Sequence, residues 1–166
     1  MKKNDVSSQA SEGKFNYRVG AIIMDSEKIL MATNSGSNHY YTVGGRVKFG
    51  ETAEEAVLRE SFEETDVQLE IDKLVFIQEN FFIMESSKEK FHEIVFYYLM
   101  KDNKKIKETN KKVFKEEYDN VILDWYTIGN LDKMIIYPDF LKTELLKLSQ
   151  NIKHFITKDG KTKEDK

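Results

Sequence analysis

Apolar residues fall in short runs along the chain, separated by polar or charged segments, and this pattern predicts a protein rich in β-strands. The runs contain many aromatic and β-branched residues, which favour strands. Strands are expected at residues 17–24, 29–32, 40–43, 74–84, 91–100 and 121–128. Polar residues 85–90 join two of these runs into a long hairpin. The charged segment 101–118 is expected to be a loop with little regular structure, and 121–128 is expected to be the last strand.

A helix is predicted to follow the third strand. Thr52 and Glu55 form a capping-box pattern, in which a hydroxyl and a carboxylate satisfy free backbone N–H groups at a helix start. Residues 53–65 contain no glycine or proline and many good helix formers. At about 100° per residue, the acidic side chains lie on one side of this helix. Leu58 and Phe62 are expected on an opposite, apolar face.

A second helix is predicted near the C-terminal end. A helical turn is expected at residues 132–136, followed by a long helix over residues 139–152. Leu141, Leu145 and Leu148 recur with helical spacing, so these side chains are expected to pack on the sheet.

The order of these elements predicts the fold class. Strands on both sides of a helix, with a second helix near the C-terminal end, indicate an α/β fold whose mixed β-sheet is covered on both faces. Neither an internal repeat nor a linker divides the chain, so a single domain is expected over residues 14–157. The polar ends, residues 1–13 and 158–166, are expected to be flexible tails.

Composition narrows the class of protein. The length of 166 residues, with 40% hydrophobic and 12% aromatic residues, fits one folded domain with its own core. A formal net charge of −3 gives no support for broad electrostatic binding, so no extended nucleic-acid partner is expected. The absence of cysteine excludes disulfides and thiolate metal sites. No apolar run has the length that crosses a bilayer, and none follows the N-terminal lysines, so a cytoplasmic protein without a membrane partner is expected.

The segment from Gly45 to Val67 carries the most specific chemical signal. It sets four glutamates around one arginine: Glu51, Arg59, Glu60, Glu63 and Glu64. In a partly buried cleft, each close pair of such carboxylates repels by up to about 4 kcal/mol. A shared proton or a bound cation relieves this repulsion. Hard cations such as Mg²⁺ prefer oxygen ligands and are completed by substrate phosphates, so the pattern predicts a cation site for a phosphorylated substrate.

Two further features of this segment bear on that prediction. Arg59 carries a planar fork of donors that can pair with Glu51 and tie the loop to the helix. Acidic runs are also common on exposed helices, and a solvated helix face is the alternative interpretation. A solvated face does not require glycines at set distances upstream, however, so Gly44, Gly45 and Gly50 favour a site.

The same segment resembles the signature of the Nudix hydrolases, which combines a glycine, four glutamates, an arginine and a closing apolar residue at fixed spacing. The matching positions are Gly45, Glu51, Arg59, Glu60, Glu63, Glu64 and Val67. Ser61 departs from the usual aliphatic residue, Asp66 from a glycine, and Val43 from a proline that many relatives carry. Because Asp tolerates left-handed backbone, Asp66 can still end the helix. The resemblance implies a Nudix-type α/β/α sandwich.

The resemblance also implies an activity. It is that of a metal-dependent pyrophosphohydrolase, which uses Mg²⁺ or Mn²⁺ to cleave a nucleoside diphosphate linked to another moiety by water attack at phosphorus. The implied partner is a small nucleotide-derived substrate, and a homodimer is in keeping with the family.

Roles follow from the resemblance residue by residue. The implied metal ligands come from the helix and the glycine turn: Glu60, Glu64, Glu63 and a backbone carbonyl of Gly44 or Gly45. Glu63 is either a third ligand or the holder of a water on the metal. Glu51 and Arg59 are expected to orient the other groups rather than to contact the substrate.

Residues outside the motif complete the prediction. Glu93 interrupts an apolar strand and is the main candidate for the general base, since a charge there costs energy unless it is paired or binds something. The alternative is an exposed edge strand. Glu79 is a weaker candidate of the same kind. Arg18 or Arg46 is a candidate to hold a phosphate, although either can be a surface charge.

Aromatic residues beside the expected cleft are candidates to stack on a base, although most aromatic residues at strand spacing belong to the core. The candidates are Tyr41 and Phe82, with Tyr40 and Phe81 next to them in the sequence. His92 is expected to be structural, and Trp125 is expected to pack in the core.

Two other functions stay open at this point. A Nudix scaffold without catalysis could bind a nucleotide or a protein partner, but such a domain has no need to retain four repelling glutamates. Hydrolysis at an RNA 5′ end is the third candidate, since a small end-binding site leaves no trace in the composition. The motif does not determine which nucleotide is the substrate.

Overall fold

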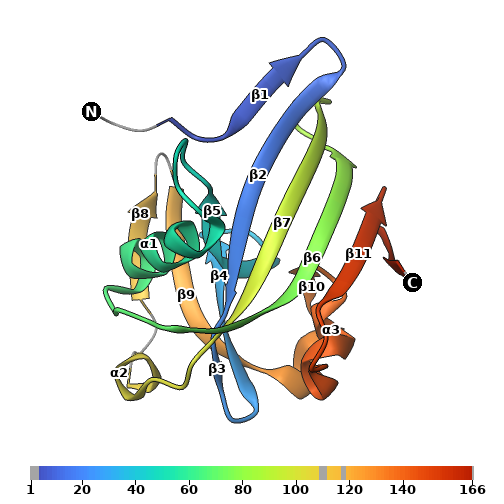
Figure 1. Ribbon diagram of the computed structural model, residues 1–166. Helices are drawn as coiled ribbons and strands as arrows, with labels where there is room; N and C mark the ends of the chain where they lie inside the picture. The colour runs from blue at the N-terminus through green and yellow to red at the C-terminus, as the bar shows by residue number, and fades with distance from the viewer. Residues whose placement is uncertain (1–3, 109–111, 117–118, 166) are drawn as a thin grey trace.

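The computed structural model of the protein describes residues 4–108, 112–116 and 119–165 (Figure 1). Within these residues, twelve strands join in one mixed β-sheet, whose main path runs β12-β11-β6-β7-β2-β5-β4-β9-β8. The strands are β1 (Ser7–Ala10), β2 (Gly13–Ile22), β3 (Met24–Asp25), β4 (Lys28–Asn34), β5 (His39–Arg46), β6 (Ile71–Ile83), β7 (Lys90–Met100), β8 (Lys112–Glu116), β9 (Asp119–Thr127), β10 (Ile135–Tyr137), β11 (Lys153–Lys158) and β12 (Lys161–Asp165). The parallel pair β2–β7 and the antiparallel hairpin β6–β7 confirm the predicted mixed sheet and hairpin.

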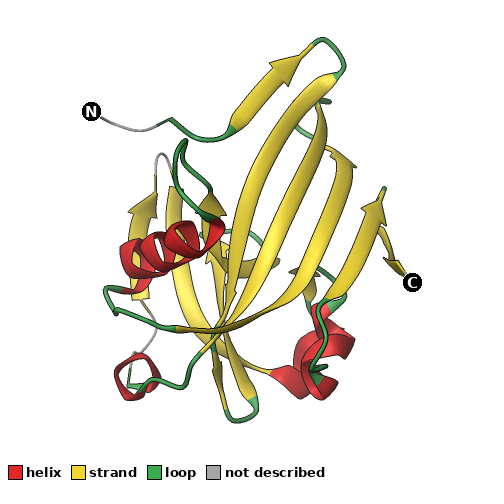
Figure 2. Ribbon diagram, viewed as in Figure 1, coloured by secondary structure: helices red, strands yellow, loops and turns green. Residues whose placement is uncertain are grey.

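Helices cover both faces of the sheet (Figure 2). The helical segments are α1 (Ala53–Thr65), α2 (Lys104–Lys107), the 3₁₀ turn η1 (Ile128–Lys133), α3 (Leu141–Glu144) and the 3₁₀ turn η2 (Leu145–Lys147). Successive side chains of a strand point to opposite faces, so β2 contributes to two cores. Ala21 packs in the core beneath α1, and Ile22 packs with Phe140 and Leu141 in the core beneath α3. The predicted sandwich, with a mixed sheet between helices, is confirmed.

The helix α1 begins and ends as predicted. Thr52 Oγ1 accepts the Glu55 N–H at 3.1 Å, and the Glu55 carboxylate accepts the Thr52 N–H at 2.8 Å. These two bonds complete the capping box. Asp66 closes the helix with a φ of 60°, the left-handed conformation that Asp tolerates better than most residues.

The predicted apolar face of α1 is wrong. Ala53 and Ala56 are buried, whereas Leu58 is only partly buried and Phe62 is 47% exposed. Glu64, which is 6% exposed, lies on the same side as the buried alanines. Small side chains let the helix approach the sheet closely, so Glu60 and Glu64 are directed toward the sheet, whereas the Glu63 side chain stays exposed.

The predicted long helix over residues 139–152 is also wrong. The helical backbone of α3 and η2 ends before Leu148, whose ψ is 123°. Ser149 Oγ then accepts the Asn151 N–H at 3.0 Å. Ser and Asn favour local turns of this kind over helix, because their side chains compete for the backbone. The chain passes into β11, which pairs in parallel with β6.

Several other secondary-structure elements differ from those predicted from the sequence. The segment 101–118 contains α2 and β8 in place of a loop, and its residues 109–111 and 117–118 lie outside the described part. The strand β9 is not the last, since β10, β11 and β12 follow it. Residues 132–136 were expected as a helical turn and are divided between η1 and β10. The unexpected strands β10 and β11 pair with β5 and β6, which are distant in sequence, whereas β8 and β12 pair with β9 and β11, which are next to them in the chain. These partners supply the stabilisation that the residues of the unexpected strands do not indicate.

Paired strands occupy parts of both expected tails. The strand β1 pairs antiparallel with β2, and Ser7 Oγ lies 2.9 Å from Asn16 Oδ1. At the other end, β12 pairs antiparallel with β11, and the Thr162 hydroxyl donates to Asp139 Oδ1 at 2.6 Å. The sheet therefore continues on both sides of the boundaries expected at 14 and 157, and the domain boundaries themselves stay a prediction.

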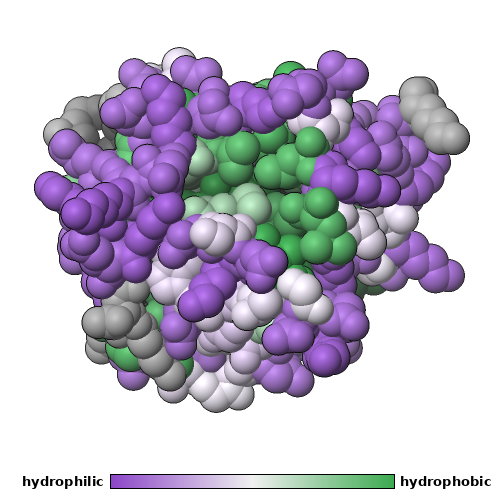
Figure 3. Space-filling model, turned by 90° about the horizontal axis from the view of Figure 1, so that it is seen from below, coloured by the Kyte–Doolittle hydropathy of each residue, from purple (hydrophilic) through white to green (hydrophobic). Residues whose placement is uncertain are grey.

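Large apolar side chains reach the surface at several places. Phe49 is 77% exposed and Leu146 is 67% exposed. Seen from below Figure 1, hydrophobic residues gather in the middle of the molecule, with hydrophilic residues around them (Figure 3). Among the described residues, no helix has the length and the apolar character that crossing a membrane requires.

Removal of the Ser61 hydroxyl is expected to stabilise the protein. Ser61 is 0% exposed, and its Oγ has no hydrogen-bond partner within the described residues. Since an unsatisfied buried hydroxyl costs about 1–3 kcal/mol, Ser61→Ala is expected to raise the free energy of unfolding by about 1 kcal/mol in urea titrations. Thr65→Val is the matched control, because it removes the bond from Thr65 Oγ1 to the Ser61 carbonyl (2.6 Å) and should lower that free energy. A less stable Ser61→Ala variant would contradict this account.

Candidate active site

The glycine turn at the end of β5 receives two glutamates of α1. The Gly44 N–H donates to Glu64 Oε1 at 2.9 Å. A Cβ added at Gly45 would lie 2.4 Å from the carboxylate carbon of Glu60, and one added at Gly44 would lie 2.2 Å from the Val19 carbonyl oxygen. A Cβ at Gly44 would therefore collide with the backbone of β2, and one at Gly45 would displace the Glu60 carboxylate from its place beside the strand.

The Arg59 guanidinium joins the acidic side chains into one cluster. Its Nε and Nη2 donate to the two carboxylate oxygens of Glu51 at 2.7 and 2.9 Å. Its Nη1 donates to Glu60 Oε1 at 2.7 Å and to Glu63 Oε2 at 3.2 Å. Its Nη2 also donates to the backbone carbonyl of Arg46 at 3.1 Å. The expected pair of Arg59 and Glu51 is present, and the same guanidinium holds two further carboxylates and the end of β5.

Lys48 belongs to this cluster, although the sequence analysis did not select it. Its N–H donates to Glu51 Oε2 at 2.9 Å, and its Nζ lies 3.9 Å from Glu63 Oε1. The sequence feature that could have indicated Lys48 was its position inside the motif, three residues before Glu51. A backbone role of this kind carries no side-chain preference, so composition could not indicate it.

Burial and charge shift the pKa values within the cluster. Hydrogen bonds from Arg59 lower the pKa of Glu51, and Glu51 in turn raises the pKa of Arg59. The pKa of Glu60 is raised, because burial outweighs the hydrogen bond from Arg59 and the nearby Glu63 adds repulsion. Burial thus disfavours the charged form of Glu60, which a nearby cation would stabilise.

The groups present fit a hard divalent cation. The donors are all oxygens, and the absent Cβ of Gly45 leaves room for the Glu60 carboxylate beside the strand backbone. As they stand, however, no three His, Cys, Asp or Glu side chains in the described part of the chain are grouped closely enough to hold a metal ion. Arg59 and the Gly44 N–H bind the carboxylate oxygens in this arrangement. A cation therefore has to replace part of these hydrogen bonds.

Glu93 is buried between partners on β2. It is 5% exposed, and its Oε1 accepts from Asn16 Nδ2 at 2.9 Å and lies 3.5 Å from Arg18 Nη1. The alternative of an exposed edge strand is wrong, because β7 lies inside the sheet between β6 and β2. Asn16 was not predicted as a site residue. In the sequence, only its position as a polar residue before an apolar run could have indicated it.

The two candidate phosphate-binding arginines face each other across β2 and β5. Arg18 is the register partner of Arg46, and like charges at such positions repel. Each arginine has an acidic neighbour: Glu93 for Arg18, and Asp5, whose Oδ2 lies 3.5 Å from Arg46 Nη1. The structure therefore brings Arg18 and Arg46 together on the strands next to the glycine turn.

The candidate stacking residues lie apart from each other. The Tyr41 hydroxyl donates to Asn34 Oδ1 at 2.5 Å, and its ring packs against the core beneath α1. Phe82 stacks on Phe91 with ring centroids 5.0 Å apart. It lines a pocket of about 450 Å³ at the tip of the β6–β7 hairpin, and this pocket includes no residue of α1. The structure does not place Phe82 beside the carboxylates, and a base-stacking role stays a prediction.

The weaker candidates have structural partners. Glu79 Oε1 lies 3.1 Å from His154 Nε2 on β11. His92 stacks on Phe81 with ring centroids 4.2 Å apart. Trp125 is partly buried and packs against the core beneath α1, as expected.

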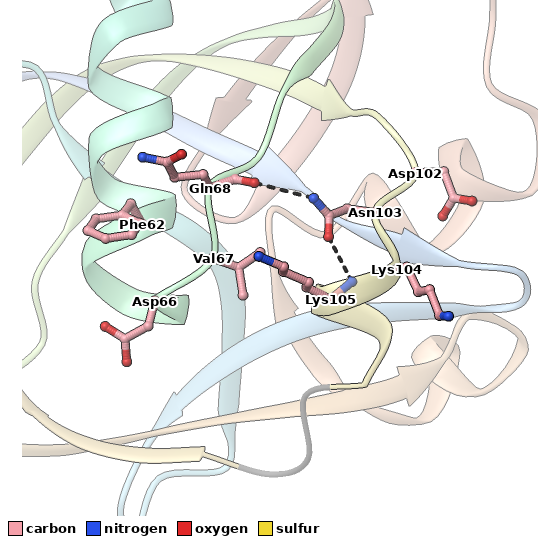
Figure 4. Close-up of a pocket in the computed structure, with 8 residues that line it drawn as sticks. All are labelled: Phe62, Asp66, Val67, Gln68, Asp102, Asn103, Lys104 and Lys105. Atoms are coloured by element: carbon pink, nitrogen blue, oxygen red, sulfur yellow. Dashed lines mark hydrogen bonds between the residues drawn. The ribbon is translucent and has the colours of Figure 1, made fainter.

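A second pocket, of about 610 Å³, lies at the C-terminal end of α1 (Figure 4). Its lining residues are Phe62, Asp66, Val67, Gln68, Asp102, Asn103, Lys104 and Lys105. Asn103 Nδ2 donates to the Gln68 carbonyl at 3.3 Å, and Asn103 Oδ1 accepts the Lys105 N–H at 2.9 Å. None of the carboxylates bound to Arg59 lines this pocket, so it is separate from the acidic cluster.

Solved structures have a similar fold. A mutator MutT protein from Bacillus halodurans has a TM-score of 0.62 at 17% identity, with 90% of this chain and 97% of that chain covered. An ADP-ribose pyrophosphatase from Streptococcus suis has a TM-score of 0.53 at 14% identity, with 86% and 98% covered. A UDP-X diphosphatase has a TM-score of 0.52 at 20% identity, with 80% of this chain covered but only 63% of that chain. At such low identity these likenesses show the fold.

Comparison of the sequence with protein families is more specific. No curated protein matches the chain. A model of the NUDIX domain family matches residues 14–143, a range that contains the glycine turn, the whole of α1 and the strands that pack on it. Since this match covers most of the chain and includes the complete set of motif carboxylates, the chain belongs to the Nudix family of hydrolases, as its sequence indicated.

Proposed function

We propose that the protein is a metal-dependent pyrophosphohydrolase, which cleaves a nucleoside diphosphate linked to another moiety by water attack at phosphorus. The observation that carries this proposal is the gathering of Glu51, Glu60 and Glu63 on one guanidinium beside the glycine turn. Among the similar structures, one is named a pyrophosphatase and another a diphosphatase, which supports a phosphoanhydride as the bond that is cleaved.

The proposed cofactor is Mg²⁺ or Mn²⁺. Glu60 and Glu64 are the proposed ligands, with Glu63 and the backbone carbonyl of Gly44 or Gly45 in support. The glutamates supply oxygen donors from α1, and the glycines supply them from the neighbouring end of β5. When bound, the cation offsets charge on phosphate oxygens and makes a water molecule more acidic.

Arg59 and Glu51 are proposed to position the cluster. The guanidinium is bonded at the same time to Glu51 in the loop, to Glu60 on the helix and to the carbonyl at the end of β5. The three elements are thereby held in one arrangement before substrate binds. Preorganisation of this kind lowers the barrier of a reaction that depends mainly on position and charge.

The substrate side is proposed to involve β2, β5 and β7. The facing arginines Arg18 and Arg46 are proposed to hold phosphate oxygens, since guanidinium groups match phosphate geometry. Glu93, fixed by Asn16, is the proposed general base outside the motif. A homodimer and a cytoplasmic location stay predictions.

A Nudix scaffold without catalysis is the second candidate function. One observation favours it: Arg59 and the Gly44 N–H already bind the carboxylates, so their charges are compensated without a metal ion. In that case the domain would bind a nucleotide or a protein partner and leave it unchanged.

A substrate panel separates the two functions. ADP-ribose, a UDP-sugar, a dinucleoside polyphosphate, nucleoside triphosphates and a capped RNA 5′ end are incubated with Mg²⁺ or Mn²⁺, and released nucleotide or phosphate is quantified. We expect turnover of at least one nucleoside diphosphate derivative, and loss of that turnover with EDTA. If no compound of the panel is turned over but nucleotide binding is measurable, the scaffold function is favoured.

Glu64→Gln is expected to reduce turnover with little loss of fold. The amide oxygen of Gln can still accept the Gly44 N–H, but the charge is lost, so kcat/KM should fall by more than about 100-fold. Glu51→Gln should cost less, about 10- to 100-fold, since Glu51 acts through Arg59. Glu144→Gln is the control: it changes a buried glutamate paired with Lys153 on the α3 side and should leave kcat/KM within about threefold. Equal or greater damage from Glu51→Gln would give Glu51 a more direct role.

Glu60→Gln is expected to raise the melting temperature at pH 7 in metal-free buffer. Burial raises the pKa of Glu60, so its charged form destabilises the folded state at every pH above that folded pKa. This destabilisation decreases as the pH falls through the raised folded pKa toward the pKa of the unfolded state, about 4.3. The increase in melting temperature from Glu60→Gln should decrease with it. Glu54→Gln, at an exposed position in the first turn, should show no such gain. An increase in melting temperature that does not depend on pH would contradict burial of the charged Glu60 as its cause.

A further inference from the structure

Residues 4–6 run beside the loop that joins β5 to α1. This loop, residues 47–52, is called the β5–α1 loop here; it holds Glu51 and ends at the capping residue of the helix. The Phe49 N–H in the loop donates to the Asn4 carbonyl at 2.8 Å. The N-terminal segment therefore contacts the loop through the backbone, independently of side-chain identity.

Two further backbone contacts extend this pairing. The Val6 N–H donates to the Val47 carbonyl at 2.7 Å. Between the two hydrogen bonds, Asp5 and Lys48 form an antiparallel bridge. Residues 4–6 thus lie along the first half of the β5–α1 loop and pair with it through one isolated bridge, and they lie outside the region 14–143 that matches the family.

Two of the other hydrogen bonds of the loop are internal, and the rest join the loop to β2 and α1. The Lys48 N–H donates to Glu51 Oε2 at 2.9 Å, and the Glu51 N–H donates back to the Lys48 carbonyl at 3.0 Å. The Val47 N–H donates to Tyr17 of β2 at 3.0 Å. Without the N-terminal segment, the loop would keep its own shape but would lose two of the bonds that fix its place on the domain.

The loop and the guanidinium cluster are directly connected. Glu51 receives two hydrogen bonds from Arg59, and Arg59 also donates to the Arg46 carbonyl immediately before the loop. The Asp5 carboxylate lies 3.5 Å from Arg46 Nη1, but both side chains are more than a third exposed. An exposed pair of this kind contributes little, so the backbone bonds are the main constraint.

We propose that residues 4–6 are a positioning element for the candidate active site. They hold the β5–α1 loop so that Glu51 keeps Arg59, and Arg59 keeps Glu60 and Glu63, in the arrangement that catalysis requires. The expected effect on the reaction rate rests on the proposed hydrolase function. The expected effect on the order of the loop does not. Groups that act by position need to be held within about 0.5 Å, so a loosened loop reduces the rate even when the fold is intact.

Val6→Pro tests this proposal, because it removes the N–H that binds the Val47 carbonyl. Asp5 already has extended backbone, as a residue before proline requires. We expect kcat to fall about 10- to 100-fold with KM changed less than about threefold, because the lost constraint acts on the chemical step. Amide hydrogen exchange at residues 47–51 should become about tenfold faster or more, whereas exchange in β6 and β7 should not change.

Two control variants isolate the hydrogen bond. Val6→Ala keeps the N–H and loses only side-chain packing, so it should retain kcat and slow exchange in the loop. Gln9→Pro places the same ring in β1, three residues further along and away from the loop, and should leave both readouts near wild type. If Val6→Pro behaves like Val6→Ala in both readouts, the proposal is wrong.

The exchange measurement keeps the test independent of the substrate. If the wild-type protein turns over nothing on the panel, the proposed function fails, while faster exchange in Val6→Pro still supports the positioning role. If Val6→Pro does not fold, the double variant Asn4→Gly/Asp5→Gly replaces it, since glycine keeps every N–H and adds backbone freedom. Loop exchange in that variant no faster than in Gln9→Gly would overturn the proposal.

Discussion

The hydrogen bonds of one guanidinium are the constraint on which the candidate active site depends. Arg59 is bonded to Glu51 in the loop, to Glu60 and Glu63 on α1, and to the backbone at the end of β5. Three segments of chain therefore share one planar donor group with fixed geometry. The positive charge also compensates carboxylates that would otherwise repel each other. Lysine could supply the charge but not the fork, so it could not hold the loop and the helix together.

The glycine turn is what lets this cluster form against the sheet. Gly45 leaves the space that the Glu60 carboxylate fills, and the Gly44 N–H binds Glu64. The small residues on the buried side of α1 have the same effect, since they reduce the distance between helix and strand. Burial then raises the pKa of Glu60, because desolvation disfavours its charged form.

Segments outside the family match extend the domain on both sides. At the N-terminal end, residues 4–6 pair with the β5–α1 loop and β1 pairs with β2. At the C-terminal end, β11 and β12 continue the sheet from β6, through hydrogen bonds of Gln78 with Thr157 at 2.8 Å and of Thr157 with Thr162 at 2.8 Å. The N-terminal addition touches the acidic cluster, whereas the C-terminal one lies several strands away from it. Only the first is therefore expected to affect catalysis.

The sequence by itself determined the parts that depend on local pattern. The capping box of α1, its end at Asp66, the β6–β7 hairpin and the pairing of Arg59 with Glu51 follow from residue type and spacing, because their partners lie within a few residues or in one motif. Tertiary structure decided the rest. Leucine spacing predicted a long C-terminal helix, but the helical backbone ends before Leu148, a serine turn follows, and the chain then pairs with β6 as β11. Strands β1, β8 and β12 have mostly polar residues and were not predicted, and each is held by the strand next to it in the chain: β2, β9 and β11. Tertiary structure also decided which face of α1 is buried. Small residues of the helix and the glycine turn of β5 together let helix and sheet approach closely, and neither segment alone indicates this contact.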